Sequence, residues 1–307
     1  IRLAMTRDLA APAWVDSVHH TLVVRIILER GGVPVALDPY IPASFSYHYG
    51  FHLIAALFST WARSLPAETL LWFGQVINAL VALSVYRLAK AVWQDVRPAA
   101  AAAILVGFAF HMPAYYLTWG RYTLLTGLVL LPLAMTAAMQ VARKPARRGD
   151  WLRLVLLTAG VALSHYTTLL LLGFFIILLL VVGLIERLAD RRKAQKEAAG
   201  DAHDAIRVPP TVNRTVLDGL WQPASGALLG LLLAVPWLAR VWQQSGSQAD
   251  LRLISPLDGG QLEYGRYILY LLGPRHNEIL LCLAGLGLIL AFFWRASRPL
   301  AAWGLLL

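Results

Sequence analysis

Long apolar stretches constrain the fold of this chain more than any other feature. About 20 apolar residues span the hydrocarbon core of a bilayer as a helix, and stretches of that order recur between residues 66 and 294. Only 14% of the 307 residues are charged, whereas a soluble domain has about 25%. The strands of membrane β-barrels alternate apolar and polar residues, and these stretches do not. The sequence therefore predicts an all-α polytopic membrane protein, with apolar stretches at 66–92, 98–118, 120–142, 151–187, 220–242 and 276–294.

The stretch 151–187 is too long for a single pass through a membrane. As one helix it would measure about 55 Å, against about 30 Å for the hydrocarbon core. Basic residues precede it at Arg148 and follow it at Arg191. Because basic ends stay on the cytoplasmic side, we expect the chain to cross twice here and to turn near His165. With this turn, the sequence predicts about seven transmembrane helices.

Basic residues are unevenly distributed among the connecting segments. By the positive-inside rule, the segments rich in Lys and Arg lie in the cytoplasm. The net charge of +10 then reflects membrane topology, and we expect no nucleic-acid partner. Four segments hold 17 of the 27 Lys and Arg residues: 87–97, 143–153, 187–214 and 295–298.

This topology divides the chain into two parts. We expect residues 1–66 to form an extracytoplasmic first loop and residues 67–307 to form a transmembrane helical domain. The second part includes a cytoplasmic linker at 188–214 and an outer loop at 243–275. The chain begins without Met and ends soon after a new apolar stretch starts, so we expect it to be truncated at both ends.

The first loop contains two helical patterns that do not span the membrane. Residues 50–62 are apolar but too short to span, and both of their ends lie outside in this topology. Residues 17–30 place apolar residues at helical spacing until Gly31, Gly32 and Pro34 stop the pattern. We expect two juxtamembrane helices in the interface, joined by a proline-rich connector.

A polar patch opens the first of these helices. On a helix that begins near Asp16, positions 16, 19 and 20 share one face, so Asp16, His19 and His20 would cluster. A carboxylate beside imidazoles at the membrane surface can accept a proton from a hydroxyl group. Asp16 could equally cap the helix, where the helix dipole would favour its charge. The sequence leaves both interpretations open.

A second pair of histidines, His48 and His52, follows with a spacing of four residues. Such a pair can bind zinc, but a zinc site normally needs three or four protein ligands, and Cys282 is distant in sequence. We therefore predict no metal, with a divalent ion at a His/Asp site as the alternative. Hydrogen bonding to a sugar or a phosphate is favoured, and Tyr49 lies in the same segment.

The other outward turns contain further candidates for binding a phosphate or a sugar. Arg121 begins an apolar stretch at its outer end, where a guanidinium can clamp a phosphate or reach lipid headgroups. Arg266 in the outer loop is a second phosphate candidate. His165 and Tyr166 lie at the predicted turn between two helices. The sequence contains no nucleotide-binding loop or serine-hydrolase motif, so an activated substrate would have to come from the membrane.

Four segments carry a resemblance to a known superfamily: APAWVDSVHHTLVVRIILERGGVP, SYHYGFHLIAALF, WGRYTLLTGLVLLP and ALSHYTTLLLL. With a large first outer loop, an early aspartate and many hydrophobic helices, the chain resembles the GT-C superfamily of integral-membrane glycosyltransferases. The resemblance implies a GT-C-like fold in a bacterial cytoplasmic membrane, with the active site on the extracytoplasmic face. The chain departs from the pattern because it lacks an adjacent Asp-Glu pair and a WWD-type motif.

The resemblance also implies a reaction. The catalytic carboxylate of the first loop would map onto Asp16, with Asp8 as the runner-up. Asp16 would deprotonate an acceptor hydroxyl on a glycan, lipid or protein, which attacks the sugar of a polyprenyl-phosphate donor with inversion. An arginine would hold the leaving phosphate, and no cofactor beyond the lipid-linked donor is implied. The substrate-binding residues would be His19, His20, His48, Tyr49, His52, Arg121, His165, Tyr166 and Arg266.

Two other functions fit the same pattern. A GT-C-like chain without activity could serve as a scaffold subunit of a larger membrane complex, and the 11 Trp and 11 Tyr residues would suit its protein contacts. A transporter of lipid-linked sugars is a further alternative. The small number of charges within the predicted helices disfavours it, because transport paths use intramembrane polar groups.

Overall fold

The structure is a computed structural model that describes residues 2–142, 147–200, 215–245 and 277–307. The described residues form helices and connecting segments, beginning with the short 3-10 helix η1 (Arg2–Thr6). Their only β interaction is an isolated bridge between Ala36 and Ser44. The predicted all-α class is thus confirmed for this part of the chain.

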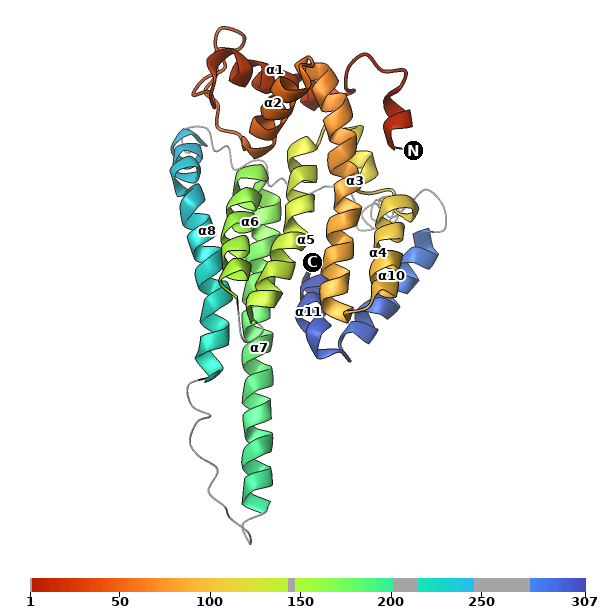
Figure 1. Cartoon of the computed structure of the whole chain (residues 1–307), viewed down its shortest axis with the longest axis vertical. Helices are drawn as coiled ribbons and strands as arrows, with labels where there is room; N and C mark the ends of the chain where they lie inside the picture. Colours follow the sequence, from red (N-terminus) through yellow and green to blue (C-terminus); the bar gives the residue numbers. More distant parts are fainter. Residues whose placement is uncertain (1, 143–146, 201–214, 246–276) are drawn as a thin grey trace, which may run out of the picture.

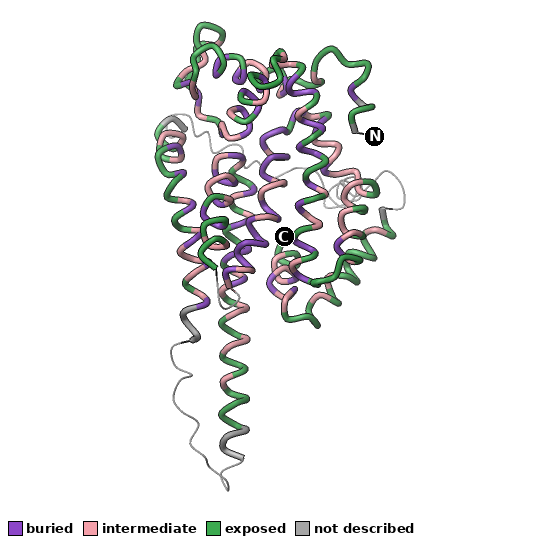
Figure 2. Tube along the Cα trace, viewed as in Figure 1, coloured by how far each residue is buried: buried purple, intermediate pink, exposed green. Residues whose placement is uncertain are grey.

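Five helices form the central bundle (Figure 1). Its core contains large apolar side chains such as Met135, Leu154 and Phe175, which are almost completely buried. Figure 2 shows that buried residues concentrate in the upper and middle parts of the bundle, whereas the lower half of α7 is mostly exposed. The five helices are α3 (Pro66–Trp93), α5 (Tyr122–Ala142), α6 (Arg148–Ser164), α7 (Tyr166–Gly200) and α8 (Thr215–Ser245).

Several of these helices are long and apolar enough to cross a membrane. Among the described residues, four qualify: α3, α5, Tyr166–Lys196 of α7 and Gly219–Gln243 of α8. A fifth span results if α10 (Asn277–Ala291) and α11 (Arg298–Leu306), which meet at 117°, count as one broken span. The chain therefore has the composition and helix lengths of a membrane protein.

The predicted number of about seven spans is not confirmed, because the described residues contain four candidate spans, or five with the bent pair. The stretch 98–118 forms α4 (Val96–Ile104), the π-helical turn η2 (Leu105–Ala109) and the 3-10 helix η3 (Ala114–Leu117). It falls short of a span because Phe110 is extended and Pro113 cannot continue a helix. Helix α6 has 17 residues, and its charged first turns shorten its apolar part.

The long stretch 151–187 is interrupted where the sequence predicts a turn. His165 has an extended backbone, with φ −163° and ψ 129°, between α6 and α7. Helix α7 then continues to Gly200, so the first part of the predicted linker 188–214 is helical. Residues 201–214 and most of the predicted outer loop 243–275 lie outside the described residues.

The first loop forms two helices at one end of the bundle (Figure 1). They are α1 (Val15–Arg30) and α2 (Gly50–Ala62), close to the two predicted juxtamembrane helices. Gly31 ends α1 with φ +69°, a conformation that glycine adopts without strain, and its N–H donates to the Ile27 carbonyl at 2.9 Å. The connector between the helices is fastened to α8, because Arg240 donates to the Pro34 carbonyl at 3.1 Å.

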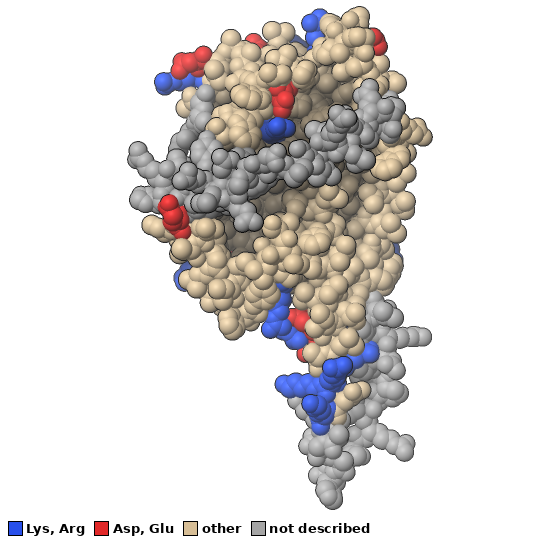
Figure 3. All heavy atoms as spheres, turned by 180° about the vertical axis from the view of Figure 1, so that it is seen from behind, with Lys and Arg blue, Asp and Glu red and all other residues tan. Residues whose placement is uncertain are grey.

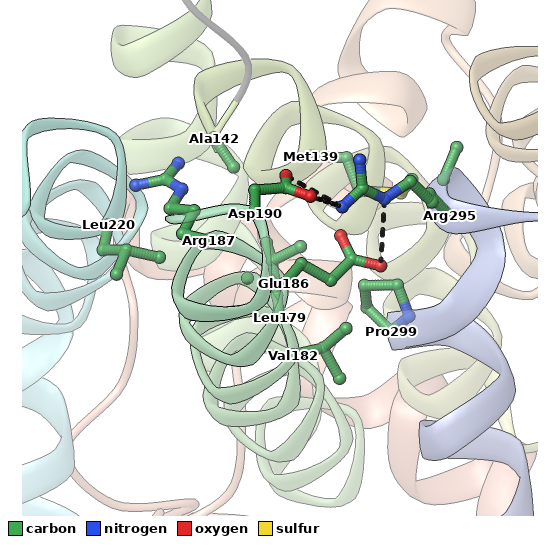
Figure 4. A pocket seen from close by; sticks show the side chains of 12 residues that line it. Met139, Ala142, Leu179, Val182, Glu186, Arg187, Asp190, Leu220, Arg295 and Pro299 are labelled. Carbon is green, nitrogen blue, oxygen red and sulfur yellow. Dashed lines mark hydrogen bonds and ion pairs between the residues drawn. The ribbon is translucent and has the colours of Figure 1, made fainter. Parts of the chain in front are cut away.

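Ion pairs connect α7 to the last two short helices at the opposite end of the bundle. Arg295, in the 3-10 helix η6 (Arg295–Ser297), donates to both carboxylate oxygens of Asp190 at 2.7 and 2.8 Å. Figure 4 shows these side chains around a cavity of about 240 Å³. Arg298 of α11 donates to Glu186 at 2.7 Å. These bonds hold the bent α10–α11 pair against the bundle.

Candidate functional site

Asp16 lies in the first turn of α1 and faces Arg121, the residue just before α5. The N-cap position is occupied by Trp14, which makes no side-chain capping bond, so Asp16 is not the N-cap residue. Its Oδ2 atom lies 3.5 Å from Nη1 of Arg121, and the side chains are 35% and 49% exposed. Both charged groups therefore remain accessible to a ligand.

A glycine at the entrance to α5 determines this juxtaposition. Gly120 has φ +66° and packs against Ser17 of α1, where a Cβ atom would collide with the Ser17 side chain and backbone. The close approach of the two backbones places Arg121 directly opposite Asp16.

The Asp16 and Arg121 side chains line a cavity of about 340 Å³. Its volume is at the lower end of the roughly 300–1,000 Å³ typical of small-molecule sites. One part is polar, and the other part has apolar walls from α1 and the connector. This lining is suited to a small ligand that has both a polar and an apolar portion. The lining residues are Asp16, His19, His20, Leu22, Val23, Leu37, Ile41, Ser44, Phe45, Ser46, Tyr47, His52 and Arg121.

A buried histidine pair forms the inner wall of this cavity. His20 Nδ1 lies 2.8 Å from His52 Nε2, and His52 Nδ1 lies 3.0 Å from the His48 carbonyl oxygen. A carbonyl only accepts, so His52 donates to it through Nδ1–H, and the neutral His52 ring accepts at Nε2 from His20. Burial lowers the pKa of His20 from 6.5 to about 4, although Asp16 opposes this shift. Burial also lowers the pKa of His52 well below its ordinary value. Both rings are therefore neutral at pH 7.

A second aromatic cluster adjoins the cavity through Tyr47. The His48 ring lies 4.3 Å from the Tyr47 ring, 4.8 Å from His165 and 5.1 Å from Tyr166, measured between centroids. His165 Nδ1 accepts from the Thr167 N–H at 3.2 Å, which leaves the proton of the neutral ring on Nε2. Burial lowers the pKa of His48 to about 3 and that of His165 to about 4.

One polar atom of this cluster lacks a hydrogen-bond partner. His48 Nε2 is buried without a partner among the described residues. A buried polar atom without a hydrogen bond lowers the stability of the folded state. It marks a position where a polar ligand group or a water molecule would be stabilised.

The structure brings together most, but not all, of the predicted site residues. Tyr49 packs edge-on against Trp237, with ring centroids 4.7 Å apart, away from the cavity. Arg266 lies outside the described residues. Asp8 is paired with its neighbour Arg7 at 3.0 Å, and its side chain is 82% exposed. Five predicted residues line the cavity, namely Asp16, His19, His20, His52 and Arg121, and three lie in the adjoining cluster, namely His48, His165 and Tyr166.

Sequence reasoning missed the lining from the connector. Ser44, Phe45 and Ser46 line the cavity, but they follow no periodic pattern that would assign them to a face. Tyr47 contacts both the cavity and the second cluster, and its hydroxyl lies 3.2 Å from Thr123 Oγ1. Its position beside His48 was the available signal, although a tyrosine at a membrane surface is equally typical of an interface anchor.

The described residues contain no group of three or more His, Cys, Asp or Glu side chains placed to hold a metal ion. His20 and His52 instead bond to each other, and His52 and His165 each direct Nδ1 to a backbone group.

The fold and the site define a helical membrane protein with a charged, histidine-lined cavity at one end of its bundle. The profile of a family of unknown function, DUF6541, matches residues 2–307, and the chain belongs to this family. Neither a curated protein nor a solved structure matches the chain.

Proposed function

We propose that this protein is a membrane glycosyltransferase that uses a polyprenyl-phosphate sugar as donor, with Asp16 as the general base. The observation that carries the proposal is the position of Asp16 and Arg121, 3.5 Å apart on the wall of one cavity. A carboxylate can accept a hydroxyl proton, and a guanidinium can hold a phosphate through two parallel hydrogen bonds. These are the two groups that sugar transfer from a phosphate leaving group requires.

The reaction proceeds by one displacement. The acceptor hydroxyl transfers its proton to an oxygen of Asp16, and its oxygen forms a bond to the anomeric carbon of the sugar. The bond between that carbon and the phosphate oxygen breaks at the same time, and the polyprenyl phosphate leaves with the bonding electron pair. Arg121 stabilises the charge that develops on the phosphate. The configuration at the anomeric carbon is inverted.

The geometry of the ion pair supports this division of roles. Charge-assisted hydrogen bonds between guanidinium and carboxylate are about 2.7–2.9 Å long, so the 3.5 Å contact is loose. A donor phosphate that binds Arg121 would compete with Asp16 for the guanidinium. Donor binding would thereby release the carboxylate to receive the acceptor proton.

The cavity has room for the reacting sugar and the phosphate, and the lipid chain would lie outside it. The apolar side chains Leu22, Leu37 and Ile41 line the cavity beside the polar groups, next to helices expected at the membrane surface. By the positive-inside rule the cavity faces the extracytoplasmic side. The His20 and His52 rings bond to each other on the inner wall of the cavity, and because both are neutral they would add no charge beside the sugar.

The test is sugar transfer by the purified full-length chain in proteoliposomes. Polyprenyl-phosphate hexoses and pentoses with a radiolabelled sugar serve as donors, and the release of free polyprenyl phosphate is measured. Asp16→Asn keeps the size of the side chain and removes the base, so turnover should fall by about 10²-fold or more. Asp8→Asn is the matched control, because Asp8 lies outside the cavity lining, and it should retain turnover.

Other results would favour the alternatives. Equal turnover of the wild-type chain and Asp16→Asn would remove Asp16 as the base. If the wild-type chain turns over none of the donors, while a larger complex that contains it does, the scaffold function would replace the enzymatic one.

A further inference from the structure

Helix α7 is longer than the membrane core is thick. Its 35 residues (Tyr166–Gly200) extend for about 52 Å, against about 30 Å for the hydrocarbon core. With Tyr166 at one boundary, about 20 residues reach the other boundary near Glu186. The remaining residues pass through the opposite headgroup layer, which is roughly 5–8 Å thick. In Figure 1 this part of α7 extends below the rest of the bundle.

Two groups of charged residues on this extension have different surroundings. Glu186 and Asp190, one turn apart, face Arg295 and form ion pairs with it (Figure 4). Glu186 also pairs with Arg298. The second group belongs to a set with the spacing i, i+3, i+4, i+7, i+8 and i+11, which is one side of a helix. Its residues line a shallow groove of about 490 Å³: Ile185, Leu188, Ala189, Arg192, Lys193 and Lys196.

The groove changes from apolar to basic along the helix axis. Ile185 and Leu188, at the level of the membrane boundary, are 59% and 44% exposed. Arg192, Lys193 and Lys196 follow one to two turns later and are also exposed. Figure 3 shows Lys and Arg side chains gathered on this narrow extension. A membrane leaflet has the same order, with acyl chains first and phosphate groups next.

We propose that this groove binds an anionic phospholipid of the leaflet opposite the Asp16 cavity. The acyl chain lies along Ile185 and Leu188, and the headgroup phosphate contacts Arg192 and Lys196. Arginine offers a planar fork of donors for phosphate oxygens, and lysine adds a mobile point charge. A free phosphate ion would leave the apolar half of the groove exposed, and a zwitterionic headgroup would bring its own cation next to the basic side chains. The proposal does not depend on sugar transfer.

The expected size of the effect follows from the charge count. A basic residue near an anionic membrane surface increases the binding constant about fivefold. Removing either Arg192 or Lys196 should therefore raise the dissociation constant for an anionic lipid by about fivefold, and removing both by about 25-fold. Binding of a zwitterionic lipid should not change, because its headgroup has no net charge.

Native mass spectrometry of the full-length protein in a non-ionic detergent measures this directly. Phosphatidylglycerol and phosphatidylcholine are added separately, and the dissociation constant of the first bound lipid is determined. The test variant is Arg192→Gln/Lys196→Gln. The control, Arg7→Gln/Arg63→Gln, removes two exposed positive charges near the other end of the bundle.

We expect the test variant alone to lose affinity for phosphatidylglycerol, and millimolar inorganic phosphate to leave lipid binding unchanged. Unaltered affinity of the test variant, or an equal loss in the control, would overturn the proposal. Displacement of phosphatidylglycerol by inorganic phosphate would also overturn it, because the groove would then recognise phosphate without its lipid.

Discussion

Gly120 packs against Ser17 with no room for a side chain between them. A Cβ atom on residue 120 would lie 2.6 Å from Ser17 Oγ, 2.8 Å from Ser17 N and 3.2 Å from Asp16 Cβ. The residue also has φ +66°, which residues with a side chain rarely adopt. This contact sets the separation of α1 and α5, and therefore that of Asp16 and Arg121.

Substituting Gly120→Ala should lower the free energy of unfolding by about 2–5 kcal/mol. Backbone strain contributes about 1–2 kcal/mol, and displacement of α1 adds about 1–3 kcal/mol. Equilibrium unfolding in mixed micelles provides the measurement. Gly31→Ala is the matched control, since Gly31 has φ +69° but a Cβ atom there would meet no described atom within 4 Å, and it should lose only the strain energy. Equal losses in both variants would contradict a role for the Ser17 contact.

The length of the apolar stretches made much of the fold predictable. The short stretch predicted at 50–62, with both ends expected outside, has the same bounds as α2 in the structure, Gly50–Ala62. The interruption at His165 followed from length and charge in the same way. Hydropathy alone could not predict that the stretch 98–118 breaks up, because the break depends on local backbone geometry around Phe110 and Pro113.

The candidate site was predictable where it depends on helical spacing. Asp16, His19 and His20 share one face of α1 and line one cavity. His48 and His52 have the same i, i+4 spacing, yet only His52 lines the cavity, because the His48 ring lies against His165. The sequence predicts Tyr49 at the site, but it packs on Trp237 of α8. Such partners come from distant helices, and sequence periodicity carries no information about them.

The stability of the protein should decrease as the pH is lowered from about 6.5 to about 4. Burial holds the pKa of His20 at about 4 in the folded chain, against about 6.5 in the unfolded chain. Between these values the unfolded state binds the proton and the folded state does not, so stability is lost as pH falls. Tyr47, His52 and Tyr122 contact the ring, and the charges of Asp16 and Arg121 lie nearby.

For His20 alone the loss should be on the order of 3 kcal/mol. Unfolding in mixed micelles between pH 4 and pH 7.5 measures it, and His20→Asn should show a shallower dependence on pH. The exposed neighbour His19 provides the control, His19→Gln, which should keep the wild-type dependence. A pH profile of His20→Asn that is parallel to the wild-type profile would rule out this contribution.

Arg121→Gln should reduce kcat/KM for a polyprenyl-phosphate sugar by about 10²-fold if Arg121 holds the leaving phosphate. Loss of one donor to a developing negative charge typically has an effect of this size. Arg121→Lys should recover part of the activity, because the charge remains but the bidentate geometry is lost. Steady-state kinetics in proteoliposomes provide the measurement. Wild-type kinetics for Arg121→Gln would show that the phosphate binds elsewhere.

Glu186→Gln should loosen the attachment of α11 to α7. Glu186 is 23% exposed and lies near both Arg298, at 2.7 Å, and Arg295, at 3.9 Å, so the substitution should cost about 1 kcal/mol, the upper end for partly exposed pairs. Hydrogen exchange of the α11 amides should then be about fivefold faster.

Asp190→Asn is the control, because Asp190 is 59% exposed and its ion pair with Arg295 reaches η6 instead of α11. Its effect should be smaller, and a larger effect than that of Glu186→Gln would mean that the Asp190–Arg295 pair holds α11 in place. In 1 M salt, where screening acts over about 3 Å, the difference between wild type and Glu186→Gln should shrink.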